Sequence, residues 1–258
     1  MGANWRHTYQ RSIYYLATSS NGSATAYVFR HDGRTLIFSE YNGSFYPQSD
    51  INDRLTGSAA TGWTYTIGDT EEVETYDTDG RLLTIRNRTG LTHYLQYDQD
   101  GRLASVSDDF GHTLGFTYAT TAGSLTAENQ IASMVDPAGR VYQYGYNNGT
   151  SALTSVTYPD STSRQYVYAG PTARALTSIV DENGATFATF AYNGFGEATL
   201  STHAGNADKV SITYTKNGFT HWGPATIVDA LGTSRTYQYT NVLGVARVTS
   251  VSQPAASG

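Results

Sequence analysis

Carboxylates at a regular spacing are the first residues in this chain whose type and position could do chemistry. Asp77 and Asp98 each follow a tyrosine and each stand three residues before a glycine. Such a pair could act as acid and base, or could bind calcium. Asp in this position also bonds to the backbone N–H groups of a turn. The chain lacks the glycine-rich nonapeptide of calcium β-rolls and the spacing of an EF-hand, so the turn is the favoured interpretation.

Arginines and tyrosines recur with these carboxylates. Arg81 and Arg102 follow the two glycines and could bind an anion. We expect instead that the arginine stem covers apolar surface and that its guanidinium pairs with an Asp of an adjacent repeat. Tyrosines at strand ends could form stacking platforms for sugars. Because they follow the repeat, we expect each ring to pack on the neighbouring hairpin with its hydroxyl hydrogen bonded.

Histidines and possible nucleophiles form no recognisable catalytic motif. The six histidines are at positions 7, 31, 93, 112, 203 and 221. None has the spacing of HxH or HExxH. The chain also contains no GxSxG and no P-loop, and Gly194-Phe195-Gly196 lacks the third glycine of GxGxxG. A Ser-His-Asp triad assembled in space remains open. We predict no enzyme, and therefore no catalytic, cofactor-binding or metal-binding residues and no cofactor.

The elements that must position these side chains are repeats of 21 residues. YDTDGRLLTIRNRTGLTHYLQ (76–96) is followed directly by YDQDGRLASVSDDFGHTLGFT (97–117). Residues 82–85 and 103–106 are short strand-like runs, and residues 92–97 and 113–118 are the returning runs, with Thr and Tyr among apolar residues. Asp-Gly supplies the positive φ of a tight hairpin turn. One repeat is therefore predicted to be one β-hairpin.

The first 70 residues have strand character but no clear period. Ser12–Ala17 and Ala24–Phe29 are predicted strands around Asn21-Gly22, and residues 35–38 return after His31-Asp32-Gly33. Residues 47–62 are polar and predicted to be a loop. Residues 63–67 and 71–76 predict a further hairpin leading into the repeats.

After Tyr118 the repeats loosen but persist. The part of the repeat that continues is the turn pattern Asp-x-x-Gly, followed by a strand that ends in Tyr. It occurs at Asp108/Gly111/Tyr118, Asp136/Gly139/Tyr146, Asp181/Gly184/Tyr192 and Asp229/Gly232/Tyr239, with a degraded copy at Asp160/Ser163/Tyr168. Insertions separate copies at 119–130, 147–152 and 169–174. Residues 124–134 are the best helical candidate, although a long loop or single turn is the favoured interpretation.

Composition supports an all-β chain and excludes several classes of function. The 258 residues include 26 Gly, 21 Tyr and no Cys, which rules out disulfides and thiol chemistry. The net charge of −6, without a basic cluster, argues against nucleic acid as the main partner. No apolar run is long enough to insert in a membrane, and the start lacks the features of a signal peptide.

The repeats resemble those of the Rhs/YD-repeat family. The family motif YDxxGRLxxV is met by residues 76–85, with Ile in place of Val, and by residues 97–106. The resemblance extends over about residues 63–251, and the first 60 residues look like the segment that precedes the repeats. It implies a fold of stacked antiparallel hairpins in a curved sheet, part of a spiral β-shell that encloses a C-terminal toxic polypeptide in bacterial proteins of this type.

Two features of the family are not met. The core-end segment of the DPxGL type is missing, since Asp136-Pro137-Ala138-Gly139-Arg140 has Arg where Leu is expected and lies amid the repeats. No toxin domain follows residue 251. The resemblance thus implies a section of shell wall, with an enclosed polypeptide and secretion machinery as partners and a secreted or cell-surface setting.

We expect three regions and hold two further functions open. The regions are an N-terminal strand and hairpin segment (1–62), the YD-repeat sheet (63–251) and a disordered tail (252–258). The exposed edges of an open sheet favour either self-association through an edge strand or N-terminal hairpins folded over one end. The alternatives to a structural module are an extracellular carbohydrate- or protein-binding adhesion module and an enzyme of unrecognised type.

Overall fold

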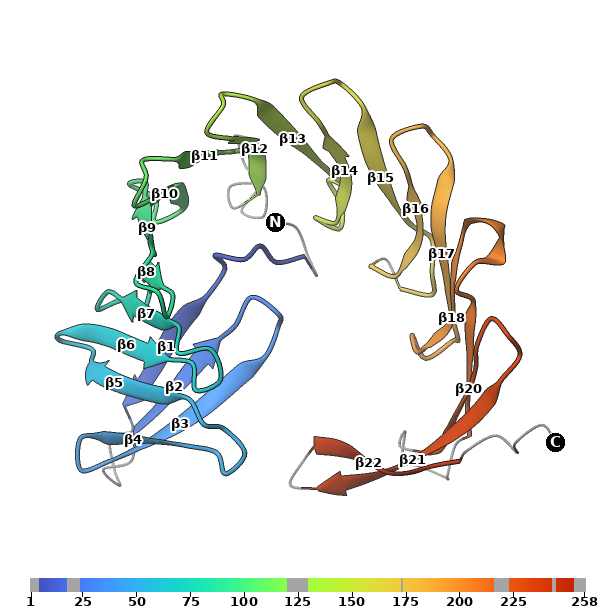
Figure 1. The fold of residues 1–258 in the computed structure, drawn as a ribbon, viewed down its shortest axis with the longest axis horizontal. Helices are drawn as coiled ribbons and strands as arrows, with labels where there is room; N and C mark the ends of the chain where they lie inside the picture. The colour runs from blue at the N-terminus through green and yellow to red at the C-terminus, as the bar shows by residue number, and fades with distance from the viewer. Residues whose placement is uncertain are drawn as a thin grey trace. The chain divides into compact units, whose positions relative to one another are not determined.

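The computed structural model describes residues 5–17, 24–119, 130–172, 174–215, 223–242 and 245–252. It divides into two compact units, Met1–Tyr144 and Gly145–Gly258. Within the described ranges the regular elements are β-strands, apart from one 3-10 turn, η1 (Ala204–Asn206) (Figure 1). The predicted all-β fold of successive antiparallel hairpins is confirmed.

The first unit begins with a four-stranded antiparallel sheet in the order β1-β2-β3-β4. Its strands are β1 (Ser12–Ala17), β2 (Ala24–Phe29), β3 (Thr35–Tyr41) and β4 (Ser44–Pro47). The first two have the predicted bounds, while the turn predicted at Asn21-Gly22 lies outside the described residues. Side chains alternate along β2 between buried and half-buried, so one face of this sheet packs against the protein and the other does not.

The rest of the first unit is a second sheet in which each strand pairs antiparallel with the next along the chain. Its strands are β5 (Arg54–Ser58), β6 (Gly62–Thr66), β7 (Val73–Tyr76), β8 (Leu82–Arg86), β9 (Thr92–Tyr97), β10 (Leu103–Asp108), β11 (Thr113–Tyr118), β12 (Ile131–Val135) and most of β13 (Val141–Tyr146). The predicted hairpins of the two clean repeats are β8–β9 and β10–β11.

The second unit continues with the same hairpin construction. Its strands are β14 (Leu153–Thr157), β15 (Ser163–Tyr168), β16 (Leu176–Val180), β17 (Thr186–Tyr192), β18 (Ala198–His203), β19 (Val210–Tyr214), β20 (Ala225–Val228), β21 (Ser234–Val242) and β22 (Val245–Val251). From β14 to β22 each strand again pairs antiparallel with its successor.

The turns that join the strands have the backbone that the sequence requires. Gly80 and Gly101, the glycines of the two Asp-Gly turns, have φ of 78° and 74°. An L-residue with a β-carbon rarely adopts this conformation, so glycine sets the sharp return of the chain. Gly80 is also packed closely, because its carbonyl oxygen accepts a hydrogen bond of 2.9 Å from the N–H of Ile13.

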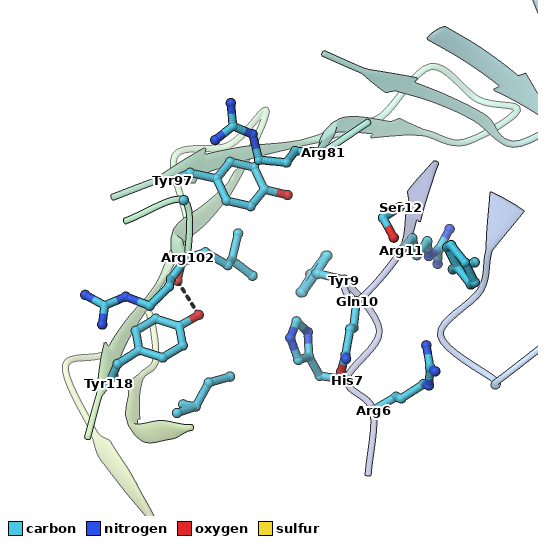
Figure 2. Close-up of a pocket in the computed structure, with 14 residues that line it drawn as sticks. Arg6, His7, Tyr9, Gln10, Arg11, Ser12, Arg81, Tyr97, Arg102 and Tyr118 are labelled. Carbon is cyan, nitrogen blue, oxygen red and sulfur yellow. Dashed lines mark hydrogen bonds between the residues drawn. The ribbon is translucent and has the colours of Figure 1, made fainter. Parts of the chain in front are cut away.

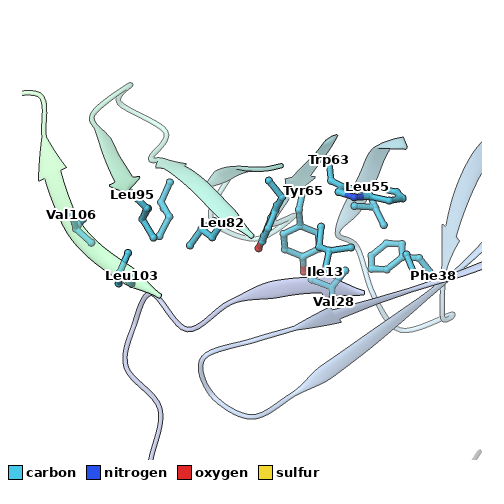
Figure 3. Close-up of a cluster of buried hydrophobic side chains, with 13 residues drawn as sticks. Ile13, Val28, Phe38, Leu55, Trp63, Tyr65, Leu82, Leu95, Leu103 and Val106 are labelled. Carbon is cyan, nitrogen blue, oxygen red and sulfur yellow. The ribbon is translucent and has the colours of Figure 1, made fainter. Parts of the chain in front are cut away.

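The two sheets of the first unit share one hydrophobic core. Ile13, Val28 and Phe38 from the N-terminal sheet lie in one buried cluster with Tyr65 and Leu82 from the repeat sheet (Figure 3). All five are at most 4% exposed. The N-terminal hairpins therefore fold over the repeat sheet. The sequence predicted that they would cover one end of the sheet, but they cover its face.

One prediction from the sequence is wrong and others stay open. Residues 47–62 are not a loop throughout, because β5 spans Arg54–Ser58 and pairs with β6 over five residue pairs. Residues 124–129 lie outside the described part, and residues 131–135 form β12 instead of a helix or loop. The tail at 253–258 also lies outside it. The division of the chain at residues 62 and 63 stays a prediction.

Candidate functional site

The repeated carboxylates bind the turns in which they lie. Oδ1 of Asp77 accepts hydrogen bonds from the N–H groups of Asp79 and Arg81, at 3.0 and 2.8 Å. Oδ1 of Asp98 is bound in the same way by Asp100 and Arg102. The equivalent oxygens of Asp108, Asp136, Asp181 and Asp229 also accept two backbone N–H groups each. The turn interpretation is confirmed.

These bonds also set the charge state of the carboxylates. Burial alone would raise the pKa of Asp98, but the N–H and guanidinium of Arg102 outweigh it and lower that pKa. The N–H of Arg140 has the same effect on the pKa of Asp136. In the described part of the chain, no three His, Asp or Glu side chains gather as a metal site would require. Asp98 and Asp136 are therefore held in the ionised form and engaged in their turns.

The arginines of the repeats pair within their own turns. Nε of Arg81 lies 2.8 Å from Oδ2 of Asp77, and Nε of Arg102 lies 2.8 Å from Oδ2 of Asp98. The prediction that the guanidinium pairs with an Asp of an adjacent repeat is therefore wrong. The turn brings the Asp and the Arg, four residues apart in the sequence, close enough to pair. The guanidinium carbon of Arg102 also lies 4.9 Å from the ring centre of Tyr118.

The tyrosines at the strand ends close the hairpins that they terminate. The hydroxyl of Tyr97 donates to the carbonyl oxygen of Leu82. That of Tyr118 donates to the carbonyl oxygen of Leu103 (Figure 2). Tyr192 and Tyr214 make the equivalent bonds in the second unit, to the carbonyl oxygens of Leu176 and Ala198. Burial raises the pKa of Tyr97 to about 12. The predicted hydroxyl partner exists, and it lies on the same hairpin.

A pocket of about 400 Å³ lies between the N-terminal segment and the repeats. His7, Tyr9 and Gln10 line it from one side, and Tyr97 and Tyr118 from the other (Figure 2). Burial lowers the pKa of His7 to about 4. Nδ1 of His7 is buried, and it lacks a hydrogen-bond partner among the described residues. The lining holds no carboxylate that could orient His7 as a general base.

A second pocket, of about 300 Å³, contains several ionisable groups, including His93, Asp108 and Asp109. Nearby, Nδ1 of His112 lies 2.8 Å from Oδ2 of Asp108, as the histidine and aspartate of a catalytic triad would. Within its turn, however, His112 occupies the place that Arg102 has in the turn before it, four residues after the Asp. The pair is thus the local form of the turn ion pair.

The other predicted positions are scattered. His31 lies in the turn after β2, and His203 ends β18 with Nδ1 3.4 Å from Asp208. His221 lies outside the described residues. The DPxGL-like stretch is an ordinary repeat turn between β12 and β13, in which Nε of Arg140 lies 2.7 Å from Oδ2 of Asp136. The structure brings none of these groups together as a reactive site.

The most densely bonded polar cluster was not foreseen from the sequence. Glu74 on β7 is fully buried and pairs with Arg11 and Arg30, the latter through bonds of 2.5 and 2.8 Å. The hydroxyl of Tyr76 also donates to Glu74. Burial alone would raise the pKa of Glu74, but the bonds and charge of Arg30 hold it below its usual value. The cluster anchors the N-terminal segment to the repeat sheet.

Comparison with protein families agrees with the repeat geometry. The family model described as RHS Repeat matches residues 76–113 and 126–163. The first match covers the hairpin β8–β9 and strand β10, with the turns that hold the Asp77–Arg81 and Asp98–Arg102 pairs. These two stretches carry the RHS repeat, which confirms the predicted resemblance to the Rhs/YD-repeat family. No curated protein matches this Rhs-repeat chain.

Solved structures resemble the chain only distantly. The crystal structure of TcdB2-TccC3 is 14% identical, with a TM-score of 0.37 over 93% of this chain. That of TcdB2-TccC3-TEV is 12% identical, with a TM-score of 0.30 over 89%. The chain spans about 15% of the length of either. These values add nothing to the assignment made by the repeats. In the described residues, no helix is long and apolar enough to cross a membrane.

Proposed function

We propose that this structural Rhs-type module forms a section of the wall of a β-shell that encloses a toxic C-terminal polypeptide. The observation that carries the proposal is that the repeated polar side chains form their bonds within their own hairpins. The Asp and Arg side chains of the two clean repeats bind their own turns, and Tyr97 and Tyr118 close their hairpins. Residues that recur with the hairpin thus build the sheet, and the chain has no catalytic role of its own.

The physical mechanism is confinement. Each hairpin alone is marginally stable, and stacking supplies the pairing and burial that it lacks. A continuous wall of this kind keeps an enclosed polypeptide away from proteases and from its targets until delivery. The setting that fits is secretion or the cell surface, with the enclosed polypeptide and the secretion machinery as partners. Self-association through an edge strand belongs to the same proposal.

Limited proteolysis of the natural full-length protein that contains this chain tests the wall. We expect the polypeptide that follows the repeats to resist a protease that cuts the same polypeptide when it is expressed alone. Leu103→Ser, in the buried core, should loosen the wall and expose it, whereas Leu91→Ser, at a side chain 46% exposed, should not. Equal cleavage in both settings, or a gene product that ends with the repeats, would reject confinement.

One observation favours an adhesion module as a second candidate. On the outward face of the N-terminal sheet, Tyr14, Tyr41 and Tyr46 are each more than half exposed, and the ring of Tyr14 lies 6.3 Å from that of Tyr27. Exposed rings on one flat face can stack on sugars. Binding on a glycan array that is lost in Tyr14→Ala with Tyr46→Ala would support this candidate, and an array without signal would remove it.

A further inference from the structure

Two turns of the repeats share one backbone conformation but differ in what lies against them. Gly80 and Gly101 have φ of 78° and 74°, and each donates its N–H to the carbonyl oxygen of the Asp three residues before it. At Gly80, β1 is packed on the turn, and the N–H of Ile13 donates to the glycine carbonyl oxygen at 2.9 Å. Among the described residues, the carbonyl oxygen of Gly101 has no such donor. The N-terminal sheet therefore closes the first turn and leaves the equivalent turn of the next repeat open.

The pocket of about 400 Å³ lies at this open turn, and it is called the Gly101 pocket below. Besides Gly101, its lining includes Tyr97, Leu103, Tyr118 and Ile131. These four residues stand where β9 ends, β10 begins, β11 ends and β12 begins, so one end of four adjacent strands forms the floor. Every lining residue belongs to the first unit. The volume falls in the range of roughly 300–1,000 Å³ that is typical of small-molecule sites.

Aromatic rings form much of the pocket wall. Tyr97 and Tyr118 are half-buried, and their hydroxyls are already bonded to backbone carbonyl oxygens. The rings are held in place by these bonds, so they offer a ligand flat surfaces instead of hydrogen bonds. His7 and Tyr9 lie across the pocket from them (Figure 2). Aromatic rings pair favourably with one another, stacked with an offset or edge to face. The wall therefore suits a planar aromatic ligand.

The charges around the pocket are already engaged. No carboxylate lines it, so a cationic ligand would find no partner there. Among its four arginines, Arg6 extends away from Tyr97 and Tyr118, and its Nη1 lies 3.5 Å from the carbonyl oxygen of Arg30 (Figure 2). The other three are each held by two carboxylates outside the lining: Arg11 by Glu72 and Glu74, Arg81 by Asp77 and Asp79, and Arg102 by Asp98 and Asp100. An anion would have to compete with those carboxylates, so the pocket favours a neutral ligand.

A few polar groups remain for a neutral ligand to bind. Burial lowers the pKa of His7 to about 4, so its ring is uncharged at physiological pH. The ring nitrogens of His7, the amide of Gln10 and the hydroxyl of Ser12 form no hydrogen bond with another described residue. Together with the carbonyl oxygen of Gly101, these groups can each give or take a hydrogen bond. A small number of such groups among aromatic side chains is the usual composition of a ligand site.

The first turn shows what the second one lacks. At Gly80, Ile13 supplies an N–H donor to the turn and is itself buried. We propose that the Gly101 pocket binds a small, neutral, planar aromatic molecule that carries an N–H or O–H donor, such as an indole or a phenol. The donor bonds to the carbonyl oxygen of Gly101, and the ring packs against Tyr97 and Tyr118. The inference does not rest on confinement, because all the lining residues lie in the first unit.

Ligands that differ in one feature test the chemistry. Saturation-transfer difference NMR on the full chain would compare indole with 1-methylindole, which has the same ring without the N–H. We expect indole to bind about tenfold more tightly, because 1-methylindole cannot donate to the glycine carbonyl oxygen. Tryptamine and indole-3-acetate, a cation and an anion built on the same ring, should bind more weakly than indole. Equal binding of indole and 1-methylindole, tighter binding of either charged ligand, or no signal from indole would overturn the proposal.

Variants of the wall test the place of binding. Tyr118→Phe and Tyr118→Leu both lose the hydroxyl bond of Tyr118, but only the leucine variant loses the ring. We expect Tyr118→Phe to bind indole as the unchanged protein does, and Tyr118→Leu to bind it about tenfold more weakly. Equal affinities for the two variants would overturn the contact with this ring. Melting curves establish that both variants fold.

A second pair of variants fills the pocket without touching the hairpins. Gln10→Trp places a ring of the chain itself in the pocket and should abolish indole binding. The matched control is Gln96→Trp on β9, which lies outside the lining and should leave binding unchanged. Both glutamines are exposed, so the fold accepts either change. Loss of binding in both variants, or in neither, would place the ligand elsewhere and reject the pocket.

Further outcomes separate this site from the other proposals. Tyr14→Ala with Tyr46→Ala, on the outward face of the N-terminal sheet, should leave indole binding unchanged, and a loss there would move the site to that face. If the peptide Gly-Trp-Gly bound more than tenfold more tightly than indole, the site would belong to a polypeptide chain, and the small molecule would be rejected. Protease protection in the full-length protein is measured without indole, so the wall and the pocket can each fail alone.

Discussion

The hydroxyl of Tyr97 donates a hydrogen bond of 2.8 Å to the carbonyl oxygen of Leu82, and this bond joins the last residue of a hairpin to its first. The turn closes one end of β8–β9, and the tyrosine closes the other. The same contact recurs in both units, so it is a construction rule of these repeats and not a property of one site.

Removing this hydroxyl should weaken the sheet. Tyr97→Phe keeps the ring but leaves the carbonyl of Leu82 without its donor, and we expect a loss of about 1 kcal/mol in the free energy of unfolding. Chemical denaturation measures it. The matched control is Tyr94→Phe on the same strand, whose exposed hydroxyl bonds to Asp109. A loss for Tyr94→Phe as large as that for Tyr97→Phe would contradict the rule.

The turn carboxylate should be replaceable by an amide. In the turn between β8 and β9, Oδ1 of Asn87 accepts the N–H of Leu91, just as Oδ1 of Asp98 accepts that of Arg102. Asp98→Asn should therefore destabilise less than Asp98→Ala, which loses an acceptor worth on the order of 1 kcal/mol. Denaturation of the three proteins at neutral pH checks the order, and equal losses would show that the charge matters more than the acceptor.

Acid should weaken the chain through Glu74. The pKa of Glu74 is lower in the folded chain than in the unfolded one, so its contribution is present above the unfolded value of about 4.3 and is lost as the pH falls through the folded value. Glu74→Gln should flatten the dependence of stability on pH below 5. Thermal melting from pH 7 to pH 3 measures it, and parallel curves for the two proteins would exclude Glu74 as the cause.

The same carboxylate should be costly to remove alone. Glu74→Leu leaves the buried Arg30 without its carboxylate and Arg11 with only Glu72, which we expect to destabilise the protein by about 3–5 kcal/mol. Replacing all three by Leu or Met should recover most of that loss, because no buried charge remains. If the triple variant is no more stable than Glu74→Leu, the cluster does not act as an ion network.

Two glycines of the same turn type should tolerate alanine differently. Both have positive φ, 78° for Gly80 and 83° for Gly111, so alanine strains either by about 1 kcal/mol. A β-carbon on Gly80 would also overlap the carbonyl oxygen of Ile13, whereas Gly111 has open space around it. Gly80→Ala should lower the melting temperature clearly more than Gly111→Ala. Similar values would mean that the N-terminal sheet does not dock as described.

The sequence predicts what depends on local pattern. The hairpins of the two clean repeats, the Asp turns and the bonded tyrosine hydroxyls all follow from residues close together in the chain. It misses β5, because Leu55 is the single large apolar residue there and pairing with β6 decides the strand. It also misses Glu74, whose partners Arg11 and Arg30 are 63 and 44 residues away. A glutamate on the same face as Tyr76 was the available signal.

The tyrosine bond also separates the parts of the chain that can change length from those that cannot. Tyr97 and Tyr118 bond 15 residues back, and Tyr192 and Tyr214 bond 16 residues back. The insertions at 119–130, 147–152 and 169–174 all come after a hairpin has ended. New sequence can therefore enter between hairpins without disturbing their register, and these joints are where peptide tags or foreign domains can be spliced into the protein.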